Sequence, residues 1–223
     1  MTAKGPFDLV RHMAEIFDDL GVKYALGGSL ASSLLGEPRS TVDVDMAVAL
    51  DVAAGEALLE LLGATFYIPI EAARAAIREH SSFNVIETAH ALKVDLFVLG
   101  DGLLDRNQIE RRVLIPIPGA PNGIWISSAE DQVLRKLDWF RQGGSVSDRQ
   151  WRDEVGILRI HAEAMDLDYL MATATEVGLA VNVLEALRES GYESTQVLAH
   201  GFERDFQDRD GQTNWAVAYP KGS

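Results

Sequence analysis

Two aspartates separated by one residue could bind a metal ion or take part in catalysis. Asp43 and Asp45 lie in the run TVDVDMAV, in which polar and apolar residues alternate. Positions i and i+2 of a strand share a face, about 6–7 Å apart at Cα, so the two carboxylates should point the same way. Carboxylates that close repel each other and resist desolvation, and oxygen ligands of this kind suit Mg²⁺. Taken alone, the pair is also typical of a solvated strand face.

A glycine turn before a helix supports a site near this pair. Gly27, Gly28 and Ser29 stand between the strand-like VKYAL and the helix-like LASSLL. Glycines let a phosphate approach the backbone, and a helix start offers free N–H groups and the positive end of its dipole. Taken alone, the segment is also a tight turn with a serine N-cap, and no Gly-Lys-Ser/Thr follows it.

A third carboxylate and a cluster of polar residues could complete the site. In KVDLFV, Lys93 and Asp95 share a strand face by the same alternation, although alone they would be read as a surface ion pair. Arg39 and Thr41 precede the Asp pair, and a guanidinium suits phosphate oxygens. A loop arginine before a strand is the equally simple interpretation of Arg39.

The elements that position these residues follow from periodicity. Helical spacing and end signals predict helices at 7–20, 29–35, 55–64, 70–80, 128–143, 147–165, 166–178 and 179–190. Alternation predicts strands at 22–28, 41–50, 82–87, 92–99, 111–119 and 123–128. The last four of these helices begin after Ser127, where strand patterns stop. In the strand at 41–50, alternation assigns Val42, Val44, Met46 and Val48 to the core.

Composition narrows the class of protein. The chain of 223 residues has a net charge of −14, with 10 basic and 17 acidic residues in each of 1–122 and 123–223. Neither half is a basic module, which argues against broad charge-driven binding of nucleic acid. The absence of cysteine excludes disulfides, Cys-ligated zinc and thiol nucleophiles. No membrane span and no export signal is recognisable, so we expect a cytoplasmic protein.

The combined pattern resembles the nucleotidyltransferase superfamily with the polymerase-β-like fold. A Gly-Ser helix start, an Asp-x-Asp on the next strand and a third Asp on a later strand occur in that order over about residues 20–165. The phrase GGSLASSLLGEPRSTVDVDM is most similar to AbiEii-type toxins and other minimal nucleotidyltransferases. The resemblance implies an α+β catalytic domain at 1–127, with a mixed sheet flanked by helices. The patterns along the chain themselves predict a helical C-terminal domain at 128–190 and, because periodicity ends there, an irregular tail at 191–223.

The resemblance also implies roles for the charged residues. Asp43 and Asp45 would ligate Mg²⁺, as one or two ions. Asp95 would ligate the second ion and help to deprotonate an acceptor hydroxyl. Lys136, on the helix SAEDQVLRKLDWFR, would neutralise the triphosphate, although an exposed helix lysine is an equal alternative.

The glycine turn and its neighbours would contact the nucleotide. Gly27, Gly28 and Ser29 correspond to the turn that holds the NTP phosphates. Arg39 and Thr41 would contact phosphate or base.

The expected function is transfer of a nucleoside monophosphate from an NTP to a hydroxyl. The acceptor could be an RNA 3′ end such as that of tRNA, a protein or a small molecule, and an antitoxin could be a partner. The alternative is a non-catalytic protein of the same fold that binds nucleotides or a partner. The intact set of Asp43, Asp45 and Asp95 favours catalysis.

Overall fold

The chain divides into two compact units in the computed structural model. The structure describes residues 5–35, 42–142 and 148–192. The units are residues 1–132 and 133–223, and the division falls inside helix α6 (Ala129–Gln142), whereas the sequence predicts a boundary after residue 127. None of the described helices is long and apolar enough to cross a membrane.

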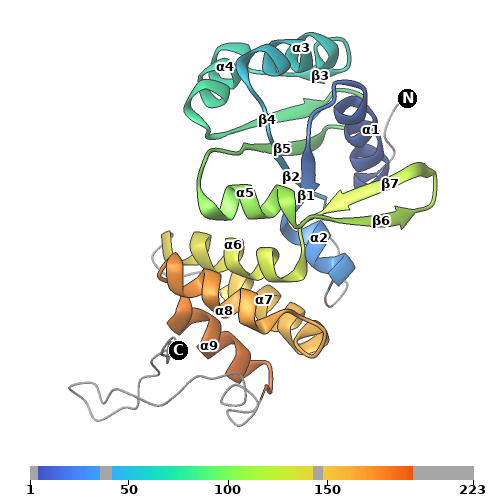
Figure 1. The fold of residues 1–223 in the computed structure, drawn as a ribbon. Helices are drawn as coiled ribbons and strands as arrows, with labels where there is room; N and C mark the ends of the chain where they lie inside the picture. Colours follow the sequence, from blue (N-terminus) through green and yellow to red (C-terminus); the bar gives the residue numbers. More distant parts are fainter. Residues whose placement is uncertain (1–4, 36–41, 143–147, 193–223) are drawn as a thin grey trace. The chain divides into compact units, whose positions relative to one another are not determined.

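A mixed seven-stranded sheet organises the first unit (Figure 1), with the order β3-β4-β5-β2-β1-β7-β6. Its strands are β1 (Tyr24–Leu26), β2 (Val44–Val48), β3 (Phe66–Tyr67), β4 (Ser82–Glu87), β5 (Leu92–Val98), β6 (Val113–Ile117) and β7 (Ala120–Ile126). The pairs β2–β5 and β1–β7 are parallel, and the other neighbouring pairs are antiparallel. The predicted α+β fold is confirmed. Strands β4 and β5 form an antiparallel hairpin, and β6 lies at one edge of the sheet.

Helices cover this sheet. The helices of the first unit are α1 (Pro6–Asp19), α2 (Gly28–Leu35), α3 (Val52–Leu62), α4 (Ile70–Glu79) and α5 (Leu103–Glu110). Helix α1 packs against β1, β2 and β7, α2 against β2, α4 against α3 and β4, and α5 against β1. The sequence reading missed α5 and the two-residue strand β3.

Alternation places one face of the central strands in the core. The buried apolar residues on this face of β2, β4 and β5 are Val44, Met46, Val48, Phe83, Val85, Val94, Leu96 and Val98. Val42, predicted to be core, is 63% exposed. That prediction is wrong because β2 begins only at Val44, so the alternation rule does not extend back to Val42.

The second unit contains helices only among its described residues. After the rest of α6, it contains α7 (Asp148–His161), α8 (Leu167–Glu176) and α9 (Ala180–Glu189). Helix α9 packs against α7 and α8. The Nε1 group of Trp151 donates to Glu189, and its ring lies 5.5 Å from that of Phe140. The predicted change from mixed structure to helices is therefore confirmed, while the predicted tail beyond 192 lies outside the described residues.

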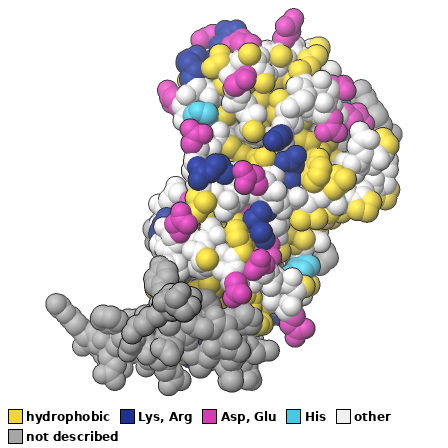
Figure 2. Space-filling model, in the orientation of Figure 1, with side chains coloured by type: hydrophobic (Ala, Val, Ile, Leu, Met, Phe, Trp, Pro, Cys, Tyr) yellow, Lys and Arg dark blue, Asp and Glu magenta, His cyan; other side chains and the backbone are white. Residues whose placement is uncertain are grey.

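Charges of both signs are interspersed on the surface. On the face of the described residues that Figure 2 presents, Lys and Arg side chains lie among Asp and Glu side chains and exposed apolar groups. This face therefore does not form a continuous basic surface of the kind that binds nucleic acid through phosphates.

Candidate functional site

Asp45 and Asp95 lie directly beside each other on two neighbouring strands. In the parallel register of β2 and β5, Asp45 is paired with Asp95 and Val44 with Val94. The two valines are fully buried on the core face. Because neighbouring residues of a strand point to opposite faces, the two aspartates share the other face. The pairing that the sequence could only suggest is thus present in the fold.

Asp43 and Lys93 extend this acidic row. Asp43 comes just before β2, and its side chain is 53% exposed. The Lys93 ammonium lies 2.7 Å from Oδ2 of Asp95 and 4.0 Å from Oδ1 of Asp43. The predicted Lys93–Asp95 pair is therefore formed, and it belongs to the carboxylate face. We name the side chains of Asp43, Asp45, Lys93 and Asp95 the acidic face.

The glycine turn lies against Asp45. The main-chain N–H of Gly27 donates to the main-chain oxygen of Asp45 at 2.8 Å. The main-chain N–H of Ser29 donates to the Asp45 carboxylate. Gly28 has φ of +59°, and a Cβ atom there would lie 1.8 Å from Oδ2 of Asp45. Only glycine lets the backbone come this close in this conformation.

The start of α2 therefore offers its free N–H groups to the acidic face. Helix α2 begins at Gly28, one residue before the predicted position, so Ser29 lies in its first turn. A helix start stabilises an anion through its unpaired N–H groups and dipole. In this structure that anion is the carboxylate of Asp45.

Asp45 has a perturbed acidity. Burial raises its pKa above the ordinary value, and the neighbouring charges of Asp95 and Asp43 raise it further. The Lys93 ammonium and the Ser29 N–H group act in the opposite direction. The net increase shows that the ionised carboxylate is not fully compensated by its neighbours. A further positive charge would stabilise it.

The donors of the acidic face fit a hard divalent cation by their chemistry. Carboxylate oxygens are the ligands that Mg²⁺ prefers. The raised pKa of Asp45 means that a nearby positive charge would stabilise its ionised form. Their present arrangement is not that of a closed cage: among the described residues, no group of three or more acidic or imidazole side chains is close enough to hold an ion. The cation that Asp43 and Asp95 contact in this structure is the ammonium of Lys93.

Similarity to solved structures identifies the fold. A nucleotidyltransferase-like antigenic protein from Paracoccidioides brasiliensis is similar at a TM-score of 0.50 and 18% identity, over 85% of this chain and 94% of that one. The antibiotic-resistance factor ANT(2'')-Ia is similar at a TM-score of 0.50 and 12% identity, over 81% of this chain and 98% of that one. The chain has the nucleotidyltransferase fold. No protein-family model and no curated protein sequence matches it, and the finer resemblance to AbiEii-type toxins stays a prediction.

The nucleotidyltransferase fold brings together six of the nine predicted site residues. These are Gly27, Gly28, Ser29, Asp43, Asp45 and Asp95. Arg39 and Thr41 lie outside the described residues. Lys136 lies on α6 in the second unit and is 5% exposed, so the alternative of an exposed helix lysine is wrong. Its phosphate contact stays a prediction.

Two polar residues beside this site were missed by the sequence reading. Asn84 on β4 is paired with Asp95 in the antiparallel register and therefore lies on the same face. Gln108 on α5 is buried, and its Nε2 atom would lie 3.7 Å from a Cβ at Gly27. Alternation on β4 could have indicated Asn84. The placement of Gln108 depends on the packing of α5 against β1, which no local pattern encodes.

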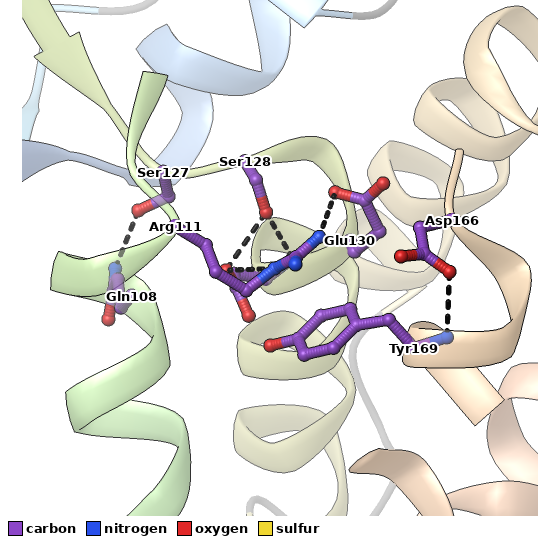
Figure 3. A network of polar contacts seen from close by, with 8 residues as sticks. Gln108, Arg111, Ser127, Ser128, Glu130, Asp166 and Tyr169 are labelled. Atoms are coloured by element: carbon purple, nitrogen blue, oxygen red, sulfur yellow. Dashed lines mark hydrogen bonds and ion pairs between the residues drawn. The ribbon is translucent and has the colours of Figure 1, made fainter. Parts of the chain in front are cut away.

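Polar contacts connect α5 and its C-terminal end with the segment that follows β7 (Figure 3). The Gln108 amide donates to the hydroxyl of Ser127 at 2.9 Å. The Ser128 hydroxyl donates to the Asp131 carboxylate at 2.9 Å and accepts from the main-chain N–H of Asp131 at 3.1 Å. Arg111 lies 3.8 Å from a carboxylate oxygen of Glu130 and equally far from one of Asp131.

Proposed function

We propose that the protein is a metal-dependent nucleotidyltransferase that transfers a nucleoside monophosphate from an NTP to a hydroxyl acceptor. The observation that carries this proposal is the cross-strand pair of Asp45 and Asp95 beside the start of α2. Acidic side chains attract a cation, whereas a helix start attracts an anion. A nucleotide bound together with its cation supplies both charges. The nucleotidyltransferase fold agrees with this assignment.

The chain's own residues would divide the work. The N–H groups at Gly28 and Ser29, with the Ser29 hydroxyl, would bind phosphate oxygens and thereby replace the carboxylate of Asp45 at the helix start. The residues that would hold Mg²⁺ are Asp43, Asp45 and Asp95, and the bound ion would neutralise charge on the phosphates. Lys136 would add a further positive charge to the triphosphate.

Asp95 would act on the acceptor. Its carboxylate would take the proton of the acceptor hydroxyl, whose oxygen forms the new bond to the α-phosphorus. The bond from that phosphorus to the β-phosphate oxygen breaks, and pyrophosphate leaves. Positioning and charge neutralisation supply most of the catalysis in phosphoryl transfers of this kind. Arg39 and Thr41 would contribute contacts to phosphate or base.

The class of acceptor is the part of this proposal that the fold leaves open. An RNA 3′ end, a protein hydroxyl and a small hydroxylated molecule are the three candidates. The net charge of −14 and the mixed charges in Figure 2 favour an acceptor other than RNA, because RNA binding draws on a basic surface. The comparisons give no support for the antitoxin partner that the AbiEii resemblance implies.

Labelling with each α-³²P NTP tests the proposal. The protein is incubated with Mg²⁺, one labelled NTP and cell extract, and the label is followed into RNA, protein and small molecules. We expect label in one fraction with wild type and none with Asp45→Asn. Asp19→Asn, the same change at an exposed position at the end of α1, is the matched control and should behave as wild type.

The outcomes separate the enzyme from a binding protein. NTP binding that depends on Mg²⁺ and on Asp45, without label in any fraction, would favour the non-catalytic alternative. Equal NTP affinity of wild type and Asp45→Asn in Mg²⁺ would show that the site is assigned wrongly.

A further inference from the structure

Lys93 brings a positive charge to carboxylates that a bound metal ion would already neutralise. Its ammonium donates to Oδ2 of Asp95 at 2.7 Å and lies 4.0 Å from Oδ1 of Asp43. It is also close enough to Asp45 to affect the electrostatics of that carboxylate. One side chain therefore acts on all three of the carboxylates that would hold a divalent cation.

We propose that Lys93 is an internal counter-ion of the acidic face, which a divalent cation must displace from Asp95 in order to bind. This inference rests on the proposed function, because it concerns the same carboxylates. It adds that the affinity of the free protein for metal is set by competition with Lys93.

The position of Lys93 on β5 produces this competition. Lys93 and Asp95 are two residues apart on one strand, so their side chains share a face. On β4, the residue paired with Lys93 is Ile86, which has no negative charge that could attract the ammonium away from the aspartates. The ion pairs of Lys93 among the described residues are thus with Asp95 and Asp43.

The Lys93 ammonium and a metal ion would repel each other if both bound the same carboxylate oxygens. Two like charges this close repel each other, and the repulsion is stronger near a protein surface than in bulk water. The Lys93 side chain is 40% exposed and that of Asp95 is 24% exposed, so solvent weakens but does not remove this repulsion. The exposed stem also leaves the ammonium free to rotate away towards water when an ion arrives.

Metal titration of lysine variants tests the proposal without any assay of activity. Mn²⁺, which reports by electron paramagnetic resonance, is titrated into wild type, Lys93→Met and Lys93→Arg. We expect Lys93→Met to bind about tenfold more tightly than wild type, which corresponds to the removal of about 1.4 kcal/mol of competition. Lys93→Arg keeps the charge and should stay within about threefold of wild type.

Lys23→Met is the matched control. Lys23 is exposed and lies before β1, opposite Ala49 at the far end of β2 from the acidic face. The same chemical change there should leave Mn²⁺ affinity at the wild-type value. Thermal unfolding in EDTA adds a second readout: Lys93→Met should unfold at a lower temperature than wild type, and Mn²⁺ should restore more of its stability.

Two results would overturn the proposal. One is Mn²⁺ affinity of Lys93→Met that equals or falls below that of wild type, and the other is no binding to either protein at millimolar Mn²⁺. If Lys93→Met does not fold in EDTA, Lys93→Gln, which retains a hydrogen-bond donor to Asp95, replaces it with the same expectation. Tighter Mn²⁺ binding without label transfer from any NTP would keep this proposal and reject the proposed function.

Discussion

Gly28 and Asp45 approach each other so closely that residue 28 has no room for a side chain. A Cβ atom at Gly28 would lie 1.8 Å from Oδ2, 2.4 Å from Cγ and 2.6 Å from Cβ of Asp45. The backbone at Gly28 is also in the left-handed region, at φ +59°. The start of α2 and the acidic strand β2 are therefore fitted to each other through this glycine.

Gly28→Ala should damage the site and the fold together. The clash reaches the Cβ of Asp45, so rotation of its carboxylate cannot relieve it, and the positive φ adds backbone strain. We expect a loss of about 3 kcal/mol in the free energy of unfolding and a loss of NTP binding. Urea unfolding and NTP titration measure the two effects.

Gly27→Ala is the matched control for this change. A Cβ there would meet its nearest neighbours at 3.7 Å and 3.8 Å, which are ordinary contact distances. It should change the free energy of unfolding by less than about 1 kcal/mol. Equal destabilisation by both alanines would mean that the close approach to Asp45 is not what requires glycine.

Asp45→Asn should stabilise the protein while it disables the site. The pKa of Asp45 is raised by burial and by Asp95 and Asp43, so its ionised form costs stability at neutral pH. Asparagine removes that charge and keeps an oxygen that can accept from the Ser29 N–H. We expect the thermal midpoint at pH 7 in EDTA to rise by about 2–4 °C, and metal-dependent NTP binding to be lost. A midpoint below that of wild type would contradict the electrostatic part of this account.

The acidic face could be predicted from the sequence strand by strand, but not as an assembly. Alternation correctly put Asp45 on one face of β2 and Lys93 with Asp95 on one face of β5. The juxtaposition of Asp45 and Asp95 depends on parallel pairing of two strands about fifty residues apart, which alternation does not encode. The resemblance to a known family supplied that step.

Local sequence patterns did not predict the positions of two kinds of residue. One kind lies just outside the hydrogen-bonded part of a strand, and the other lies on an element that the patterns do not indicate. Val42 obeys the alternation of the sequence, yet it precedes β2 and is 63% exposed. Gln108 is a polar residue that only the packing of α5 against β1 explains, and α5 itself was not predicted. Tertiary contacts decide both positions, and propensity alone does not.

The hydrogen bond from Gln108 to Ser127 should contribute measurably to stability. Gln108 is 6% exposed and Ser127 is fully buried, so the bond is sheltered from water. Gln108→Leu leaves the Ser127 hydroxyl without this donor and should cost about 1–3 kcal/mol in the free energy of unfolding. The double variant with Ser127→Ala should recover part of that loss, because no buried polar group then lacks its partner. Strictly additive losses in urea unfolding would show that the two side chains do not act on each other.

Tyr24 should make the folded state sensitive to alkaline pH. The side chain of Tyr24 is 1% exposed on β1, and burial raises the pKa of its hydroxyl from 10.0 to about 12. The unfolded chain therefore loses this proton at lower pH than the folded chain, and stability falls as the pH rises between these two values. The loss amounts to about 3 kcal/mol at most, since the shift spans about two pKa units and one unit corresponds to about 1.4 kcal/mol. Tyr24→Phe should remove this loss. The free energy of unfolding in urea should therefore differ less between pH 7.5 and pH 11 in this variant than in wild type. Tyr67→Phe, at a position that is 64% exposed, serves as the control. An equal alkaline loss in wild type and Tyr24→Phe would assign the sensitivity to other groups.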